Sequence, residues 1–144
     1  MNFNSEINTD DPGIDFENYS LEEEIAKYDG VTPQGYQILV RLFVPKKVTK
    51  IGSILLPESQ IEKLNEDAKF TNLTGLVIKF ARGVYKDEEL YKHTKEYCKV
   101  GDWIQFARAS GHSFTHNNMS SIYITEHKIF GTVKDPRTIS RIKA

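Results

Sequence analysis

The sequence predicts a mainly all-β protein, folded as an antiparallel barrel or sandwich. Between residues 36 and 44, large apolar side chains recur at every second position, which is the period of a β-strand. Short segments of similar character follow along the chain, at residues 76–80, 103–107, 113–116, 122–125 and 129–133. Turn-forming residues separate these segments, namely Gly75, Gly83, Gly101, Gly111 and the pair Asn117–Asn118. Many short strands with regular turns are typical of barrels and sandwiches.

The clearest predicted strand is the one at residues 36–44. Ile38, Val40 and Leu42 point to one of its faces. Leu39, Arg41 and Phe43 point to the other face. Pro45 ends the strand, because proline has no backbone N–H to donate to a neighbouring strand.

An acidic N-terminal extension, residues 1–34, precedes this strand. Its first 30 residues hold nine acidic residues and one basic residue, within a chain whose net charge is −1. We expect residues 1–19 to be mobile or draped over the body. Ser20 followed by Glu23 is a capping-box pattern, which predicts a short helix over residues 21–28. The charge asymmetry fits nucleic-acid contact or a solubilising tail, and we favour the tail.

No catalytic or cofactor motif is present, so we predict a protein that is not an enzyme and holds no cofactor or metal. Nothing resembles a nucleophile elbow, a P-loop or a dinucleotide fingerprint. His112 and His116 flank a predicted turn, without a cysteine or a carboxylate pair to complete a zinc site. Cys98, the single cysteine, precedes a Val–Gly–Asp turn, and we expect a half-buried structural role for it.

The sequence predicts a cytoplasmic protein with no membrane contact. No window approaches the roughly 18 consecutive apolar residues that a membrane span needs. The first residues lack the basic start and apolar core of a secretory signal. A single cysteine permits no internal disulfide, which fits a reducing compartment.

The most informative segment is the loop predicted after the first strand, at residues 46–60. It begins with a small basic cluster and continues into an apolar tip, in the order Lys46, Lys47, Lys50, Gly52, Ser53, Ile54, Leu55 and Leu56. The apolar run could form a short buried strand, but Gly52 and Pro57 bracket it closely. Residues of this kind can stay mobile until a partner offers an apolar groove.

Elementary magnitudes suit reversible binding by several copies of this loop. Burial of each of its three large aliphatic side chains contributes about 1.5–3 kcal/mol. Ordering the loop costs about 1–2 kcal/mol for each residue that is fixed. One copy would bind weakly, whereas several copies on one oligomer would bind well, because each later contact is effectively intramolecular. The loop therefore indicates an oligomer.

At five places the sequence resembles the GroES-like co-chaperonins, and most closely the members encoded by bacteriophages. Residues 36–44 resemble the opening barrel strand of that family. The tip at residues 52–56 is similar to the family's Gly-Gly-Ile-x-Leu motif in its mobile loop, with Ser53 in place of the second glycine. Residues 74–78 and the Val–Gly–Asp turn within residues 98–106 are similar to later strands, and residues 122–133 to the closing ones. The likeness covers residues 35–135.

The resemblance implies an irregular antiparallel GroES-like β-barrel at residues 35–135, with one or two short helices in the extensions. It implies a long flexible loop at residues 46–60, a roof-like segment at residues 83–98 and a C-terminal tail at residues 136–144. The implied function is a co-chaperonin that caps a GroEL-like chaperonin ring and closes a chamber for protein folding. The implied assembly is a homo-oligomeric ring, heptameric as in the family. A phage-type member would act in the host cytoplasm on a capsid-protein client.

In this interpretation the apolar tip of the loop is the chaperonin-binding site. Its residues are Gly52, Ser53, Ile54, Leu55 and Leu56, with Gly52 supplying flexibility. Lys46, Lys47 and Lys50 would steer the loop towards an acidic surface of the chaperonin. The sequence departs from the family in three places: the acidic extension, a longer stretch at residues 57–72, and a more helix-like roof segment in which we expect one helical turn.

Two other functions remain open on the sequence alone. The same barrel could serve as a structural module in virion assembly, with the acidic extension and the tail as interlocking arms. It could instead be an OB-like binder of single-stranded nucleic acid, which needs a basic groove lined by exposed aromatic residues. We regard nucleic-acid binding as the weaker alternative, because most aromatic residues occupy strand positions that a barrel core would use.

Overall fold

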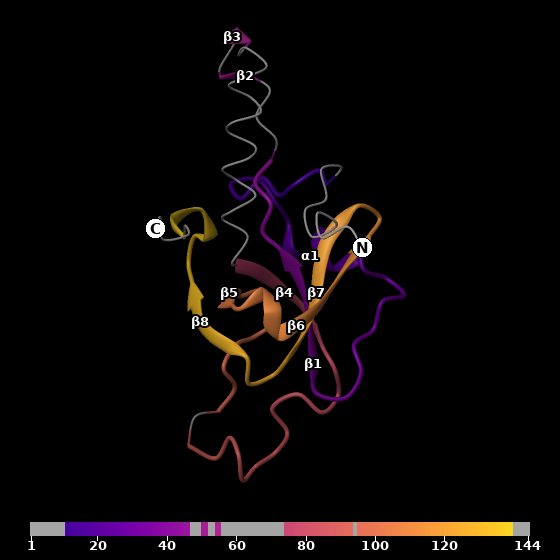
Figure 1. Ribbon diagram of the computed structural model, residues 1–144, viewed down its shortest axis with the longest axis vertical. Helices are drawn as coiled ribbons and strands as arrows, with labels where there is room; N and C mark the ends of the chain where they lie inside the picture. Colours follow the sequence, from indigo (N-terminus) through magenta and orange to yellow (C-terminus); the bar gives the residue numbers. More distant parts are fainter. Residues whose placement is uncertain (1–10, 47–49, 52–53, 56–73, 94, 140–144) are drawn as a thin grey trace.

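A six-stranded antiparallel sheet forms the body of the protein, as Figure 1 shows for the computed structural model. The structure describes residues 11–46, 50–51, 54–55, 74–93 and 95–139. The strand order in the sheet is β6-β7-β1-β4-β5-β8. Its strands are β1 (Gln37–Leu42), β4 (Thr74–Phe80), β5 (Trp103–Phe106), β6 (Gly111–His116), β7 (Met119–Thr125) and β8 (Ile129–Val133). The prediction of a mainly all-β, antiparallel fold is confirmed.

Shorter elements complete the described chain. The helix α1 (Leu21–Ala26) precedes the sheet. Two 3-10 helices, η2 (Arg108–Ser110) and η3 (Pro136–Thr138), lie before β6 and after β8. The strands β2 (Lys50–Ile51) and β3 (Ile54–Leu55) pair with each other and form a sheet of their own.

Both faces of the central strand β1 are buried. Ile38, Val40 and Leu42 lie in one cluster of buried apolar residues. Leu39 and Phe43 lie in a second cluster on the opposite side. The predicted alternation of β1 is therefore confirmed, and both of its faces are covered by protein.

The N-terminal extension covers one of these faces. Ile14 and Tyr28 are buried members of the second cluster, and Phe16, Tyr19 and Leu21 pack against it. Residues 11–34 therefore contribute apolar surface to the core of the sheet. The division of the chain at residue 34 stays a prediction.

The helix α1 begins where the capping pattern predicts. The backbone N–H of Glu23 donates to the Ser20 hydroxyl at 3.4 Å, so Ser20 is the N-cap. The helix ends at Ala26, two residues before the predicted end. Tyr28, just beyond it, turns its hydroxyl into the sheet, where it meets the Ser121 hydroxyl at 2.5 Å.

Two glycines that we predicted as turn residues lie inside strands instead. Gly75 belongs to β4, and a Cβ there would collide with the Val40 side chain and the Arg41 carbonyl. Gly111 belongs to β6, and a Cβ there would lie 2.6 Å from the Tyr123 carbonyl oxygen. Both glycines permit close packing within the sheet, which is why β4 and β6 each begin two residues before the predicted start.

The predicted turn at Asn117–Asn118 is confirmed. Both residues have positive φ, at 49° and 67°, and they join β6 to β7 between the paired residues His116 and Met119. A two-residue hairpin turn with φ positive at both positions favours asparagine, whose short polar side chain tolerates that conformation. Gly101, with φ at 97°, likewise lies at the predicted turn before β5.

Candidate functional site

The predicted binding loop carries a short hairpin apart from the main sheet. In its ladder Lys50 pairs with Leu55 and Ile51 pairs with Ile54. Figure 1 shows β2 and β3 at the top of the view, beyond the end of β1 and away from the other strands. Two of the predicted docking residues, Ile54 and Leu55, thus form β3. We call β2 and β3 together the docking hairpin.

The remaining predicted residues of this loop fall outside the part that the structure describes. These are Lys47, Gly52, Ser53 and Leu56. The helical spacing noted near residues 58–70 also lies outside the described residues. Lys46 is described and is exposed to solvent, which suits its predicted role in steering.

A hairpin of this size is suited to binding through its backbone and its apolar residues together. A two-stranded hairpin is marginally stable by itself in water. In general, the free edge of a hairpin can pair with an added strand, while neighbouring apolar side chains enter pockets on the partner. The arrangement can therefore bind a groove on a partner, and it supplies no chemistry of its own.

The base of this loop, residues 44–46, is held against the N-terminal extension. The Ile14 N–H donates to the Val44 carbonyl at 2.7 Å, and Ile14 forms an isolated parallel bridge with Pro45. One residue earlier, the Phe43 N–H donates to the Thr74 carbonyl of β4 at 2.9 Å. The chain therefore leaves the sheet at a point that is fixed on two sides.

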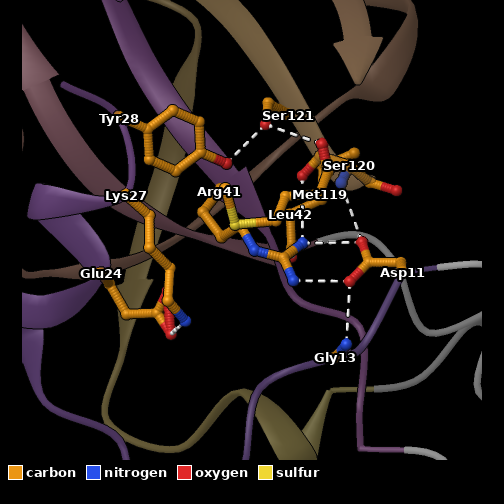
Figure 2. A network of polar contacts seen from close by, with 10 residues as sticks. All are labelled: Asp11, Gly13, Glu24, Lys27, Tyr28, Arg41, Leu42, Met119, Ser120 and Ser121. Carbon is orange, nitrogen blue, oxygen red and sulfur yellow. Dashed lines mark hydrogen bonds and ion pairs between the residues drawn. The ribbon is translucent and has the colours of Figure 1, made fainter. Parts of the chain in front are cut away.

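A buried ion pair fixes the extension just before that contact (Figure 2). The Asp11 carboxylate accepts hydrogen bonds from both terminal guanidinium nitrogens of Arg41, at 2.8 and 2.6 Å. It also accepts the backbone N–H groups of Gly13 and Ser120, each at 2.8 Å. The side chains of Asp11 and Arg41 are 0% and 1% exposed.

The pKa of Asp11 reflects this environment. Burial disfavours the charged carboxylate, but the hydrogen bonds and the positive charge of Arg41 outweigh burial and lower the pKa below its usual value of 3.8. The strand period predicted the face on which Arg41 lies, but not its partner. The available signal for a buried partner was a charged residue between apolar neighbours in a central strand. A buried guanidinium needs a carboxylate or carbonyl groups as acceptors.

Acid should weaken the fold through Asp11. Because the folded-state pKa lies below 3.8, ionised Asp11 stabilises the folded protein above that pH, and the contribution is lost as the pH falls through the folded pKa. We expect the free energy of unfolding, measured with urea at a series of pH values, to fall steeply below about pH 4. Asp29→Asn should keep this dependence, because Asp29 is exposed, whereas Asp11→Asn should flatten it. Equal acid dependence in both variants would contradict the assignment.

The roof-like segment, residues 83–98, lies at the opposite end of the body from the docking hairpin, at the bottom of Figure 1. Three tyrosines pack together in it, with ring centroids of Tyr85 and Tyr91 at 5.0 Å and of Tyr91 and Tyr97 at 5.6 Å. The Tyr85 hydroxyl donates to the Glu126 carbonyl at 2.7 Å. The Tyr91 N–H donates to the Asp87 carbonyl and the Lys95 N–H donates to the Tyr91 carbonyl, so two hydrogen bonds have the spacing of a helical turn, where we expected one turn.

No reactive centre emerges in the described part of the chain. Cys98 is 3% exposed, more deeply buried than the half-buried position we predicted. Burial raises the pKa of its thiol to about 11, so it stays protonated near neutral pH. Among the described residues, no group of three or more histidine, cysteine or acidic side chains is placed to hold a metal ion. No helix among them is long and apolar enough to cross a membrane.

The geometry defines a class of protein, an antiparallel β-sheet body with a two-stranded hairpin apart from the main sheet. Comparison with protein families gives the particular family, since the model described as Chaperonin 10 Kd subunit matches residues 30–133. The chain belongs to this family, the GroES-like co-chaperonins. A search of curated proteins returned no match. The protein is thus a co-chaperonin of a family whose members are non-catalytic partners of chaperonins.

Proposed function

We propose that this chain caps a chaperonin ring through the docking hairpin and closes a chamber in which a client protein folds. The observation that carries the proposal is the position of Ile54 and Leu55 on a hairpin that follows the central strand and lies apart from the main sheet. In the proposed complex the hairpin enters an apolar groove on each chaperonin subunit. ATP binding and hydrolysis belong to the chaperonin, and this chain supplies the lid.

The proposed binding residues are those of the loop tip, Gly52, Ser53, Ile54, Leu55 and Leu56. Ile54, Leu55 and Leu56 are the apolar anchors, and burial of each contributes about 1.5–3 kcal/mol. Gly52 supplies flexibility to the loop. The basic side chains Lys46, Lys47 and Lys50 steer the hairpin towards an acidic surface, an effect that depends on ionic strength.

The proposed assembly is a homo-oligomeric ring, with seven subunits as the family resemblance implies. A ring matches the energetics, because several weak contacts made at once bind far more tightly than one. We further propose the bacteriophage-type role, in which the protein acts in the host cytoplasm on a large capsid subunit. Chamber size would be set by the lid, so a client too large for the usual chamber is the natural candidate.

Binding to a bacterial chaperonin, with and without ATP, tests the proposal. We expect the purified chain to be captured only with nucleotide, and Leu55→Asp to lose capture by at least about a hundredfold, because a desolvated carboxylate in an apolar groove is costly at every copy. Val100→Asp is a matched control, since Val100 is an exposed aliphatic residue that lies outside the hairpin. Capture should be measured by co-sedimentation and by light scattering.

Other outcomes separate the alternatives. Nucleotide-independent association with capsid or scaffold proteins, unaffected by Leu55→Asp, would support the assembly-module hypothesis. Binding to oligonucleotides that weakens steeply with salt would support the nucleic-acid hypothesis. Equal capture of wild type and Leu55→Asp by the chaperonin would remove the hairpin from the binding site.

A further inference from the structure

The base of the predicted binding loop is in close backbone contact with a segment of the N-terminal extension. Residues 11–14, which we call the N-terminal anchor, run beside residues 44–46, the loop base. Gly13 has φ at +77°, and a Cβ there would lie 2.5 Å from the Pro45 carbonyl oxygen and 2.8 Å from the Lys46 Cα. Only glycine lets the two backbones approach this closely.

The anchor is itself bonded to the sheet. The loop base, which contacts the anchor, is therefore held in place relative to the sheet. Asp11 is tied to Arg41 of β1 and to Ser120 of β7 by buried hydrogen bonds. Three residues later, Ile14 is buried in the core, and its N–H donates to the Val44 carbonyl. Figure 2 shows Asp11 and Gly13 beside the guanidinium of Arg41.

From this geometry we infer that the N-terminal anchor is a positioning element for docking: it fixes the direction in which the loop leaves the sheet. The inference rests on the proposed function. A loop whose base is fixed explores fewer orientations before binding, so less conformational entropy is lost when the hairpin enters a groove. In a ring, the same fixed direction keeps several hairpins aligned with several grooves at once, which is the condition for multivalent binding.

The pair of variants Gly13→Ala and Gly30→Ala tests the inference. Gly30 has φ at +83°, close to that of Gly13, but a Cβ there would meet nothing within 4 Å. Both variants therefore carry the same kind of backbone strain, and only Gly13→Ala pushes the anchor away from Pro45. We expect Gly13→Ala to bind the chaperonin about tenfold or more weakly than Gly30→Ala, because a loss at each hairpin multiplies over the ring.

Hydrogen exchange at Ile14 provides the structural readout. In the wild type and in Gly30→Ala the Ile14 amide should be protected, and in Gly13→Ala it should exchange faster, because its bond to Val44 is broken. Loss of Ile14 protection with chaperonin affinity equal to that of Gly30→Ala would overturn the inference. A wild type that binds no chaperonin would instead refute the proposed function, and the positioning role with it.

A second variant covers the case in which Gly13→Ala does not fold. Deletion of residues 1–14 combined with Arg41→Met removes the anchor without leaving a buried charge unpaired. Thermal unfolding establishes that this variant is folded before binding is measured. This variant should form the sheet, and it should bind the chaperonin at least as weakly as expected for Gly13→Ala. Wild-type affinity for the chaperonin in this variant would also refute the positioning role.

Discussion

Replacing Arg41 by alanine is expected to lower the free energy of unfolding by about 3–5 kcal/mol, because it leaves the Asp11 carboxylate buried without its counter-ion. Asp11 is 0% exposed and accepts two of its four hydrogen bonds from Arg41. The loss would be a large fraction of the stability of a typical domain, which is about 5–15 kcal/mol. Urea denaturation followed by circular dichroism measures it.

Arg137→Ala is the matched control for this prediction. Arg137 also bonds to carboxylates, those of Glu17 and Asp135, but its side chain is 47% exposed. Its removal should cost far less stability than that of Arg41, because water screens exposed ion pairs. A cost for Arg41→Ala as small as that for Arg137→Ala would show that Asp11 is hydrated in solution.

A double replacement separates the pair from its parts. Asp11→Asn with Arg41→Met removes both charges, so no unpaired ion stays in the core. The double variant should be more stable than Arg41→Ala alone, because a lone buried charge is worse than two neutral side chains. The test also needs Asp11→Asn and Arg41→Met as single variants. If the loss of stability in the double variant equals the sum of the two single losses, the side chains do not interact, and the ion pair does not hold the extension to the sheet.

Local patterns in the sequence were sufficient to predict most strands of the sheet. The period of two at residues 36–44 predicted β1, and β8 has the bounds that were predicted from residues 129–133. These predictions succeeded because strand alternation and turn residues are properties of neighbouring residues. The prediction of a turn at Gly75 was wrong because the role of this glycine depends on Val40 in the adjacent strand, which the local sequence does not reveal.

The contribution of the extension to the core depends on contacts between distant residues. Asp11 and Arg41 are 30 residues apart, and Asp11 and Ser120 are 109 residues apart. An acidic composition alone predicted a solvated tail, since charged residues are rarely buried unless they are paired. The short aliphatic run bracketed by Gly52 and Pro57 is by contrast a local signal, and β3 lies within it. The binding role of its side chains stays a prediction.

Replacing Trp103 by alanine is the second change for which we expect a large effect, a loss of about 3–5 kcal/mol in the free energy of unfolding. Trp103 lies on β5 and is 4% exposed. Its ring meets those of Phe16, Tyr19 and Phe43 edge to face, with centroids 5.4–5.9 Å apart. The substitution would open a cavity where the extension packs on the sheet, so the extension and the sheet would each lose apolar contacts.

Trp103→Phe distinguishes ring packing from the hydrogen bond that the indole makes. The Trp103 Nε1 donates to the Tyr19 hydroxyl at 3.0 Å, and phenylalanine keeps an aromatic ring while losing this donor. We expect Trp103→Phe to retain more stability than Trp103→Ala, since most of the aromatic contact survives. Because the extension reaches the sheet at both Trp103 and Arg41, Trp103→Ala should also speed hydrogen exchange at Ile14. Unchanged exchange there would mean that the ion pair alone holds the N-terminal anchor.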